Sequence, residues 1–131
     1  MNDRLRRIGL VFWLLTAWYV PTHAHHSFVA TYITGERIQI KGVIVDFQFR
    51  NPHSFIHVLA PDPQGDMQRW AVECAGTAVL ARENVSAKAL KPGDKVIITG
   101  HPGRDPADHR LLLLSIERPR DGWKWTPPWA R

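Results

Sequence analysis

The chain has 131 residues, a length typical of a single domain. Its hydrophobic fraction of 44% and charged fraction of 22% are close to those of globular proteins, which excludes a disordered or collagen-like chain. The single cysteine excludes an internal disulfide and any zinc site built on several thiolates.

Residues 1–24 have the features of a secretory signal peptide. Three arginines near the start are followed by an apolar run over residues 10–20, which is shorter than the roughly 20 residues of a membrane-spanning helix. Pro21 interrupts the run, and Ala24 supplies the small residue of a cleavage site. An uncleaved anchor is the alternative. We expect cleavage after Ala24, a periplasmic or secreted location, and no stable membrane span after cleavage.

Cleavage there would remove three arginines and one aspartate, and so lower the net charge from +5 to +3. This mild excess does not indicate a nucleic-acid partner, and export makes such a partner unexpected. Six of the seven histidines would remain.

Residues 25–36 are expected to form an N-terminal leader, followed by a domain over residues 37–118 in which short strands alternate with turn signals. A short helix is expected over residues 78–82, with Thr77 as its N-cap. The Lys-Pro-Gly-Asp segment at 91–94 has Pro and Gly at the two central positions of a type II turn. The expected strands cover residues 38–49, 54–60, 68–74, 95–100 and 110–117.

The first strand changes phase along its length. Ile38 and Ile40 share one parity, whereas Val43, Val45 and the two phenylalanines that follow have the other. A glycine at position 42 is expected to form a β-bulge that bends this strand.

The order β-β-β-α-β-β predicts a mainly β fold, an OB-like five-stranded barrel with one short helix between strands three and four. An open α+β sheet is the alternative. Residues 119–131 form a Trp/Pro-rich C-terminal tail containing Trp123, Trp125 and Trp129. We expect the tail to fold back over an open barrel end, with an exposed partner contact as the alternative.

His25, His26 and His53 are the candidate metal ligands. An N-terminal His25 could bind one metal through both its α-amine and its ring, and one more imidazole would complete a three-nitrogen site suited to Cu(II) ahead of zinc or nickel. The leader spans up to about 40 Å when extended, enough to bring His25 back to the Asn-Pro-His turn that ends at His53. Histidines near a cleavage site can also be merely flexible polar residues, so a protein without a cofactor is the alternative.

Three further histidines lie in the expected domain. His101 and His109 bracket the loop between the fourth and fifth strands, and with His53 they are expected at one end or face of the barrel. His57 follows His53 by four residues on a strand, about 13 Å away, so one metal ion cannot easily bind both. We expect a structural role for His57.

Cys74 has the parity of Trp70 and Val72, which predicts a buried, unreactive thiol. Glu73 has the opposite parity, and a surface ion pair is expected there, with metal ligation as the alternative. The chain has no phosphate-binding glycine loop, serine-nucleophile elbow or paired-carboxylate motif. No catalytic residue is therefore assigned, and an enzyme is not favoured.

Several segments together resemble an uncharacterised family of small secreted bacterial proteins, domain of unknown function family 6152. The resemblance covers nearly the whole mature chain and implies a secreted, β-rich domain, but no function. It is carried by Ala24-His25-His26-Ser27-Phe28, Lys41-Gly42-Val43, Asn51-Pro52-His53, Trp70-Ala71-Val72-Glu73 and Leu90-Lys91-Pro92-Gly93-Asp94.

These observations favour a periplasmic binding module. The most concrete hypothesis for its ligand is copper. The competing hypothesis is a metal-independent binder of a small molecule, a glycan or a periplasmic protein, using the barrel face and the tryptophan tail. A copper-dependent oxidoreductase is the third, since the same N-terminal histidine could serve one, but nothing identifies a substrate.

Overall fold

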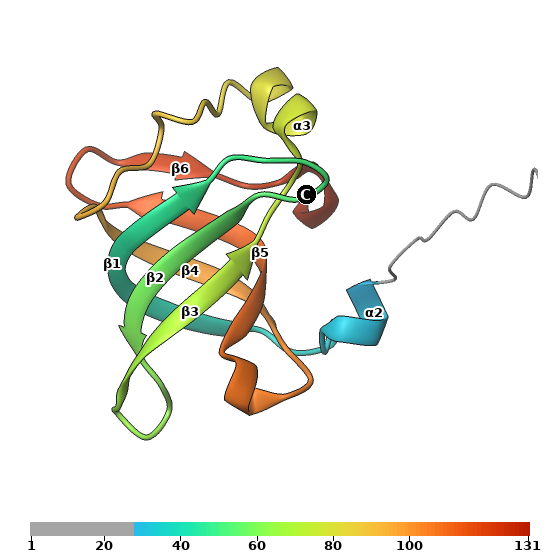
Figure 1. Cartoon of the computed structure of the whole chain (residues 1–131), viewed down its shortest axis with the longest axis vertical. Helices are drawn as coiled ribbons and strands as arrows, with labels where there is room; N and C mark the ends of the chain where they lie inside the picture. The colour runs from blue at the N-terminus through green and yellow to red at the C-terminus, as the bar shows by residue number, and fades with distance from the viewer. Residues whose placement is uncertain (1–27) are drawn as a thin grey trace, which may run out of the picture.

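The computed structural model describes residues 28–131, which fold into a closed five-stranded β-barrel (Figure 1). The mainly β class and the single helix between the third and fourth strands are confirmed. The strands are β1 (Ile38–Gln48), β2 (Phe55–Pro61), β3 (Met67–Glu73), β4 (Lys95–Pro102), β5 (Arg110–Arg118) and the short β6 (Trp123–Trp125). The helices are α2 (Phe28–Thr31) and α3 (Thr77–Arg82), with 3-10 turns η1 (Pro106–Asp108) and η2 (Pro128–Ala130).

The strands follow the order β3-β2-β1-β4-β5-β6, and a pairing between β3 and β5 closes the barrel. The closing pair is parallel, with Ala71 opposite Arg110, and all other pairs are antiparallel. The long β1 serves two neighbours, because its first half pairs with β4 and its second half with β2. This order is consistent with an OB-like barrel.

The bend in β1 lies later than the sequence pattern indicated. The register with β2 shifts between Ile44 and Asp46, so the bulge is not at Gly42. Ile40 and Ile44 both face the core, whereas Val43 and Val45 are 37% and 38% exposed.

Gly42 has a different role, which is to let β1 and β2 approach closely. A Cβ atom at this position would lie 2.3 Å from the carbonyl oxygen of Leu59 and 2.7 Å from a side-chain carbon of Val58. No larger residue fits there without displacing the β2 backbone.

The helix α3 lies at the barrel end where β1 ends, and it buries Leu80 completely in the core (Figure 1). Thr77 is the first helical residue and not the N-cap, which is Gly76 and makes no side-chain cap. The missing cap is supplied from another loop, because Asn51 Oδ1 accepts hydrogen bonds from the Thr77 backbone N–H and hydroxyl, both at 3.0 Å. This contact ties the β1–β2 turn to the helix.

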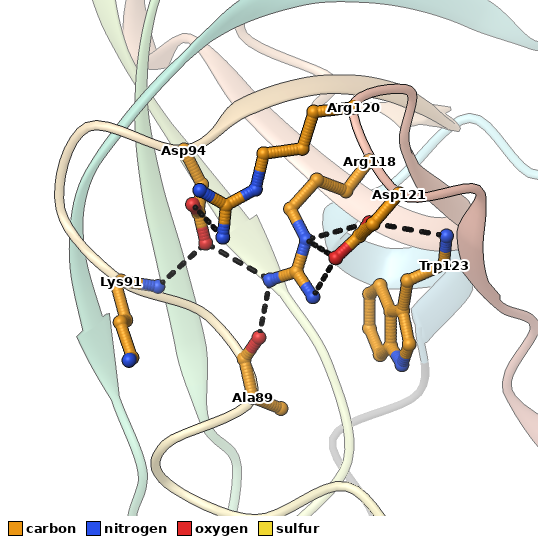
Figure 2. Close-up of polar contacts among 7 residues, drawn as sticks. All are labelled: Ala89, Lys91, Asp94, Arg118, Arg120, Asp121 and Trp123. Atoms are coloured by element: carbon orange, nitrogen blue, oxygen red, sulfur yellow. Dashed lines mark hydrogen bonds and ion pairs between the residues drawn. The ribbon is translucent and has the colours of Figure 1, made fainter.

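The type II turn at residues 91–94 is confirmed. Gly93 has φ +92°, and the Asp94 N–H donates to the Lys91 carbonyl at 3.0 Å. Figure 2 shows the buried Asp94 carboxylate between two guanidinium groups, those of Arg118 at 3.0 Å and Arg120 at 3.1 Å. This cluster fastens the turn to the end of β5.

The C-terminal tail packs on the barrel. Trp125 pairs with Ile116 of β5 and is buried, and Trp123 lies under the Arg118 guanidinium at 5.4 Å. Trp129 stays 38% exposed, although its ring N–H donates to the Leu113 carbonyl at 3.0 Å. Within residues 28–131, no helix is long and apolar enough to cross a membrane.

Candidate functional site

The turn that carries His53 is held from both sides. Its Asn51 side chain binds the start of α3, and the Asn51–Pro52 peptide bond is cis. The fully buried Ser54 hydroxyl accepts from the Arg50 N–H at 3.1 Å and donates to the Arg50 carbonyl at 3.0 Å. These bonds fix the backbone on which the His53 ring is presented.

His53 is bound to a buried carboxylate. Its Nδ1 contacts Oε1 of Glu73, the last residue of β3. The His53 side chain is 37% exposed and that of Glu73 only 8%. A carboxylate accepts hydrogen bonds and does not donate them, so Nδ1 carries a proton, and Nε2 is the nitrogen that holds the lone pair when the ring is neutral.

Glu73 forms an ion pair as expected, with Arg110, but the expected surface location is wrong because Glu73 is buried. Its Oε2 accepts from the Tyr32 hydroxyl and from Arg110 Nη2, the latter at 3.2 Å. A buried carboxylate is tolerated only when such donors replace its hydration. Tyr32 is fully buried, and burial followed by the Glu73 interaction raises the pKa of its phenol well above the usual range. The hydroxyl therefore remains a proton donor to the carboxylate.

Aromatic side chains enclose this cluster on the side of the leader. The Phe28 ring lies 5.9 Å from the His53 ring, 6.5 Å from Tyr32 and 6.1 Å from Trp129. The Arg110 guanidinium lies 5.7 Å from the Tyr32 ring. Phe28 thus contacts both His53 of the Asn-Pro-His turn and Trp129 of the tail.

The other two predicted ligands, His25 and His26, lie outside the described residues. Within residues 28–131, no group of three or more His, Cys, Asp or Glu side chains could hold a metal ion. The described part of the predicted site is therefore His53 with its supporting carboxylate.

The three loop histidines do not come together. The β1–β2 turn and the β4–β5 loop lie at opposite ends of the barrel (Figure 1). His101 Nδ1 contacts the Glu36 carbonyl at 2.5 Å, and His109 stacks edge-on against Trp70 at 5.2 Å. Each of these rings has its own local partner.

His57 lies on the outer face of β2, away from the core. Burial, followed by the nearby charge of Arg69, lowers the pKa of its ring. His57 therefore remains neutral at neutral pH.

Cys74 is buried as expected, and its Sγ contacts the Ser54 carbonyl at 3.3 Å. Burial, and then the neighbouring Glu73 charge, raises the pKa of the thiol to about 12. A neutral, inaccessible thiol is a poor nucleophile and a poor metal ligand.

A cavity of about 250 Å³ opens where the β2–β3 and β4–β5 loops approach each other. Trp70 and His109 line it together with Ile38, and Glu36 and Arg110 add charged groups. His109 has a positive φ of 45°, which directs the chain from η1 into β5. The walls are mostly apolar with a few polar groups, a combination typical of small-molecule sites.

Two residues of the cluster, Tyr32 and Arg110, were missed by the sequence reasoning. Tyr32 belongs to the expected leader, which was treated as a connector, yet it pairs with Gly103 and is fully buried. Arg110 was placed correctly at the start of a strand, but its partner could not be read from spacing.

The fold and the site define a small closed β-barrel in which a buried carboxylate orients one half-exposed histidine. The chain belongs to a family of unknown function, DUF6152, whose model matches residues 14–112. The match includes the four clustered residues Tyr32, His53, Glu73 and Arg110 and excludes the tryptophan tail. A search of curated proteins finds no match.

Proposed function

We propose that this protein is an exported periplasmic module that binds a copper ion through His25, His26 and His53. The observation that carries the proposal is the setting of His53. Its Nδ1 is occupied by a buried carboxylate, and its side chain is 37% exposed. A metal-binding histidine characteristically donates the N–H of its second ring nitrogen to a carboxylate. This hydrogen bond fixes the tautomer and directs the other nitrogen at the metal.

The position of Phe28 supports a role for His25 and His26 in the proposed copper site. Its ring packs at 5.9 Å from the His53 ring. His26 and His25 precede Phe28 by two and three residues, so covalent geometry keeps their Cα atoms within about 8 and 11 Å of the Phe28 Cα. Both imidazoles are therefore within reach of His53 without any change in the barrel.

The ligand chemistry favours copper. Cleavage after Ala24 would give His25 a free α-amine, which has a pKa of about 8 in model peptides and loses its proton readily to a metal. The amine, the His25 ring and one further imidazole supply three nitrogen ligands, a set that suits tetragonal Cu(II) better than zinc.

The test begins with the mass of the exported chain, which should start at His25. Titration of that chain with Cu(II), followed by EPR, should then show nitrogen ligation. His53→Ala should weaken binding at least about tenfold, and His57→Ala, a histidine on the outer face of β2, should leave it unchanged. Equal affinity in wild type and His53→Ala, or a chain that begins elsewhere, would refute the proposed site.

The cavity beside Trp70 favours a second candidate, a metal-independent binder of a small molecule. Its volume of about 250 Å³ is below the usual range for ligand pockets, so only a small ligand would fit. Saturable binding of a small molecule that is lost in His109→Gly but unchanged by a chelator would support this candidate. Glycine accepts the positive φ at position 109, so that variant removes the imidazole without straining the loop.

A further inference from the structure

A groove of about 480 Å³ crosses the outer face of the barrel, and it shares Arg110 with the cluster around His53. The strand register explains its position, because Gln48 lies opposite Phe55, His57 opposite Ala71, and Ala71 opposite Arg110. His57, Ala71 and Arg110 form one row across β2, β3 and β5, and Gln48 and Phe55 form the adjacent row on β1 and β2; these four strands are neighbours in Figure 1. The small Ala71 side chain leaves the row hollow between two longer neighbours.

Two positive charges meet at the same aromatic ring in this groove. The guanidinium carbon of Arg50 lies 5.4 Å from the Phe55 ring centroid, and that of Arg110 lies 5.8 Å from it. Arg50 is exposed, and it forms no ion pair within residues 28–131. The groove is lined by a single carboxylate, Asp108, which is exposed at its rim. Arg110 is already paired with Glu73, whereas Arg50 supplies a cation that has no ion-pair partner within residues 28–131.

Both guanidinium groups keep donors available for a ligand. Arg110 uses Nη2 for Glu73 and Tyr32, while its Nε and Nη1 groups have no hydrogen-bond partner within the described part of the chain. The Arg50 side chain likewise has none there, although its backbone is fixed by two hydrogen bonds to Ser54. A guanidinium carries five N–H donors in a planar fork that matches the oxygens of a carboxylate or phosphate.

His57 adds a neutral polar group to the floor. Burial and the neighbouring Arg69 lower the pKa of its ring, so at neutral pH the ring can donate one hydrogen bond without adding charge. The groove thus combines two fixed guanidinium groups with one neutral donor.

We infer that this groove binds a small oxyanion group, a carboxylate or a phosphate, between Arg50 and Arg110. The bound group balances the charge of Arg50 and occupies the unused donors of both guanidinium groups. The inference does not rest on copper binding. Its test is made at Arg50, which, unlike Arg110, has no contact with the His53–Glu73 pair, so the two proposals fail separately.

The experiment is a titration of the metal-free exported chain with sodium phosphate and, separately, with sodium acetate, followed by NMR of the backbone amides. Sodium chloride at equal ionic strength is the reference. Saturable shifts at Phe55, His57 and Ala71 with phosphate, with acetate or with both are expected, and they identify which oxyanion the groove takes. Shifts that match those in chloride, or that never saturate, overturn the inference.

Two variants complete the test. Arg50→Gln should weaken the saturable binding about tenfold, since it removes one charge-assisted donor pair. Arg82→Gln, an exposed arginine on α3, should bind like the wild type. The spectrum of Arg50→Gln should otherwise match the wild type, because the side chain has no structural hydrogen bond within residues 28–131. Undiminished binding by Arg50→Gln overturns the inference.

Discussion

Replacing Glu73 by glutamine tests whether the buried carboxylate orients His53 for metal binding. One oxygen of Glu73 accepts from both the Tyr32 hydroxyl and Arg110, and the other contacts His53 Nδ1. In Glu73→Gln, the single amide oxygen should stay with the two strong donors, Tyr32 and Arg110. The amide NH₂ group then faces His53 Nδ1.

This exchange should reverse the tautomer of the ring. Facing an N–H donor, Nδ1 must accept, so the proton moves to Nε2 and occupies the nitrogen proposed to bind the metal. Loss of a supporting carboxylate typically reduces metal affinity by about 10- to 100-fold. Loss of the charged hydrogen bonds should also lower the free energy of unfolding by roughly 1–3 kcal/mol.

Copper affinity is measured by titration of the exported chain, and the free energy of unfolding by urea denaturation of the metal-free protein. Glu117→Gln is the matched control, because Glu117 pairs with Lys124 on the surface and should change stability by less than about 1 kcal/mol. A Glu73→Gln variant that binds copper as tightly as wild type, while His53→Ala does not, would refute the tautomer argument.

Three further changes test the fold. Gly42→Ala should destabilise the protein by roughly 1–3 kcal/mol in urea denaturation, because the new Cβ would lie 2.3 Å from the Leu59 carbonyl oxygen. Gly35→Ala, where the Cβ would meet open space, should not destabilise it. Burial opposes ionisation of Asp94, yet hydrogen bonds from the Lys91 N–H and Arg118 hold its pKa below the ordinary 3.8. The Asp94 contribution to stability should therefore be present above about pH 4 and be lost as the pH falls further. Asp94→Asn should flatten this part of the profile of stability against pH, and an unchanged profile in that variant would contradict the prediction. The Cys74 thiol, with its pKa raised to about 12, should resist a thiol reagent at pH 8 in the folded protein and react at once in denaturant; rapid labelling of the folded chain would show that burial does not protect it.

The strands and turns were predictable because their signals are local. Alternating side chains mark β3 and the residue that follows it, where Trp70, Val72 and Cys74 are all buried as expected. The Lys-Pro-Gly-Asp turn follows from the φ values that Pro and Gly adopt, and Gly93 has the positive φ that a type II turn requires.

The position of the bulge could not be predicted in the same way. The parity of Val43 and Val45 suggested a phase change at Gly42, but which residues of β1 face the core depends on the pairing of β1 with both β2 and β4. The bulge lies between Ile44 and Asp46, where the strand passes from one partner to the other. The sequence of one strand does not show where its pairing changes from one neighbouring strand to the other.

By itself, the sequence determined that the chain is a mainly β domain of this family and that His53 stands on a turn. Only the tertiary structure decided what surrounds that histidine. Glu73 has the parity of an outward-facing residue, and it is buried because Tyr32, 41 positions earlier, folds over it and Arg110 approaches from β5. Contacts between residues so far apart in the sequence depend on how the barrel closes, and spacing along the chain does not show this. Because of these contacts, a carboxylate with the parity of a surface residue is buried and holds His53 in the candidate site.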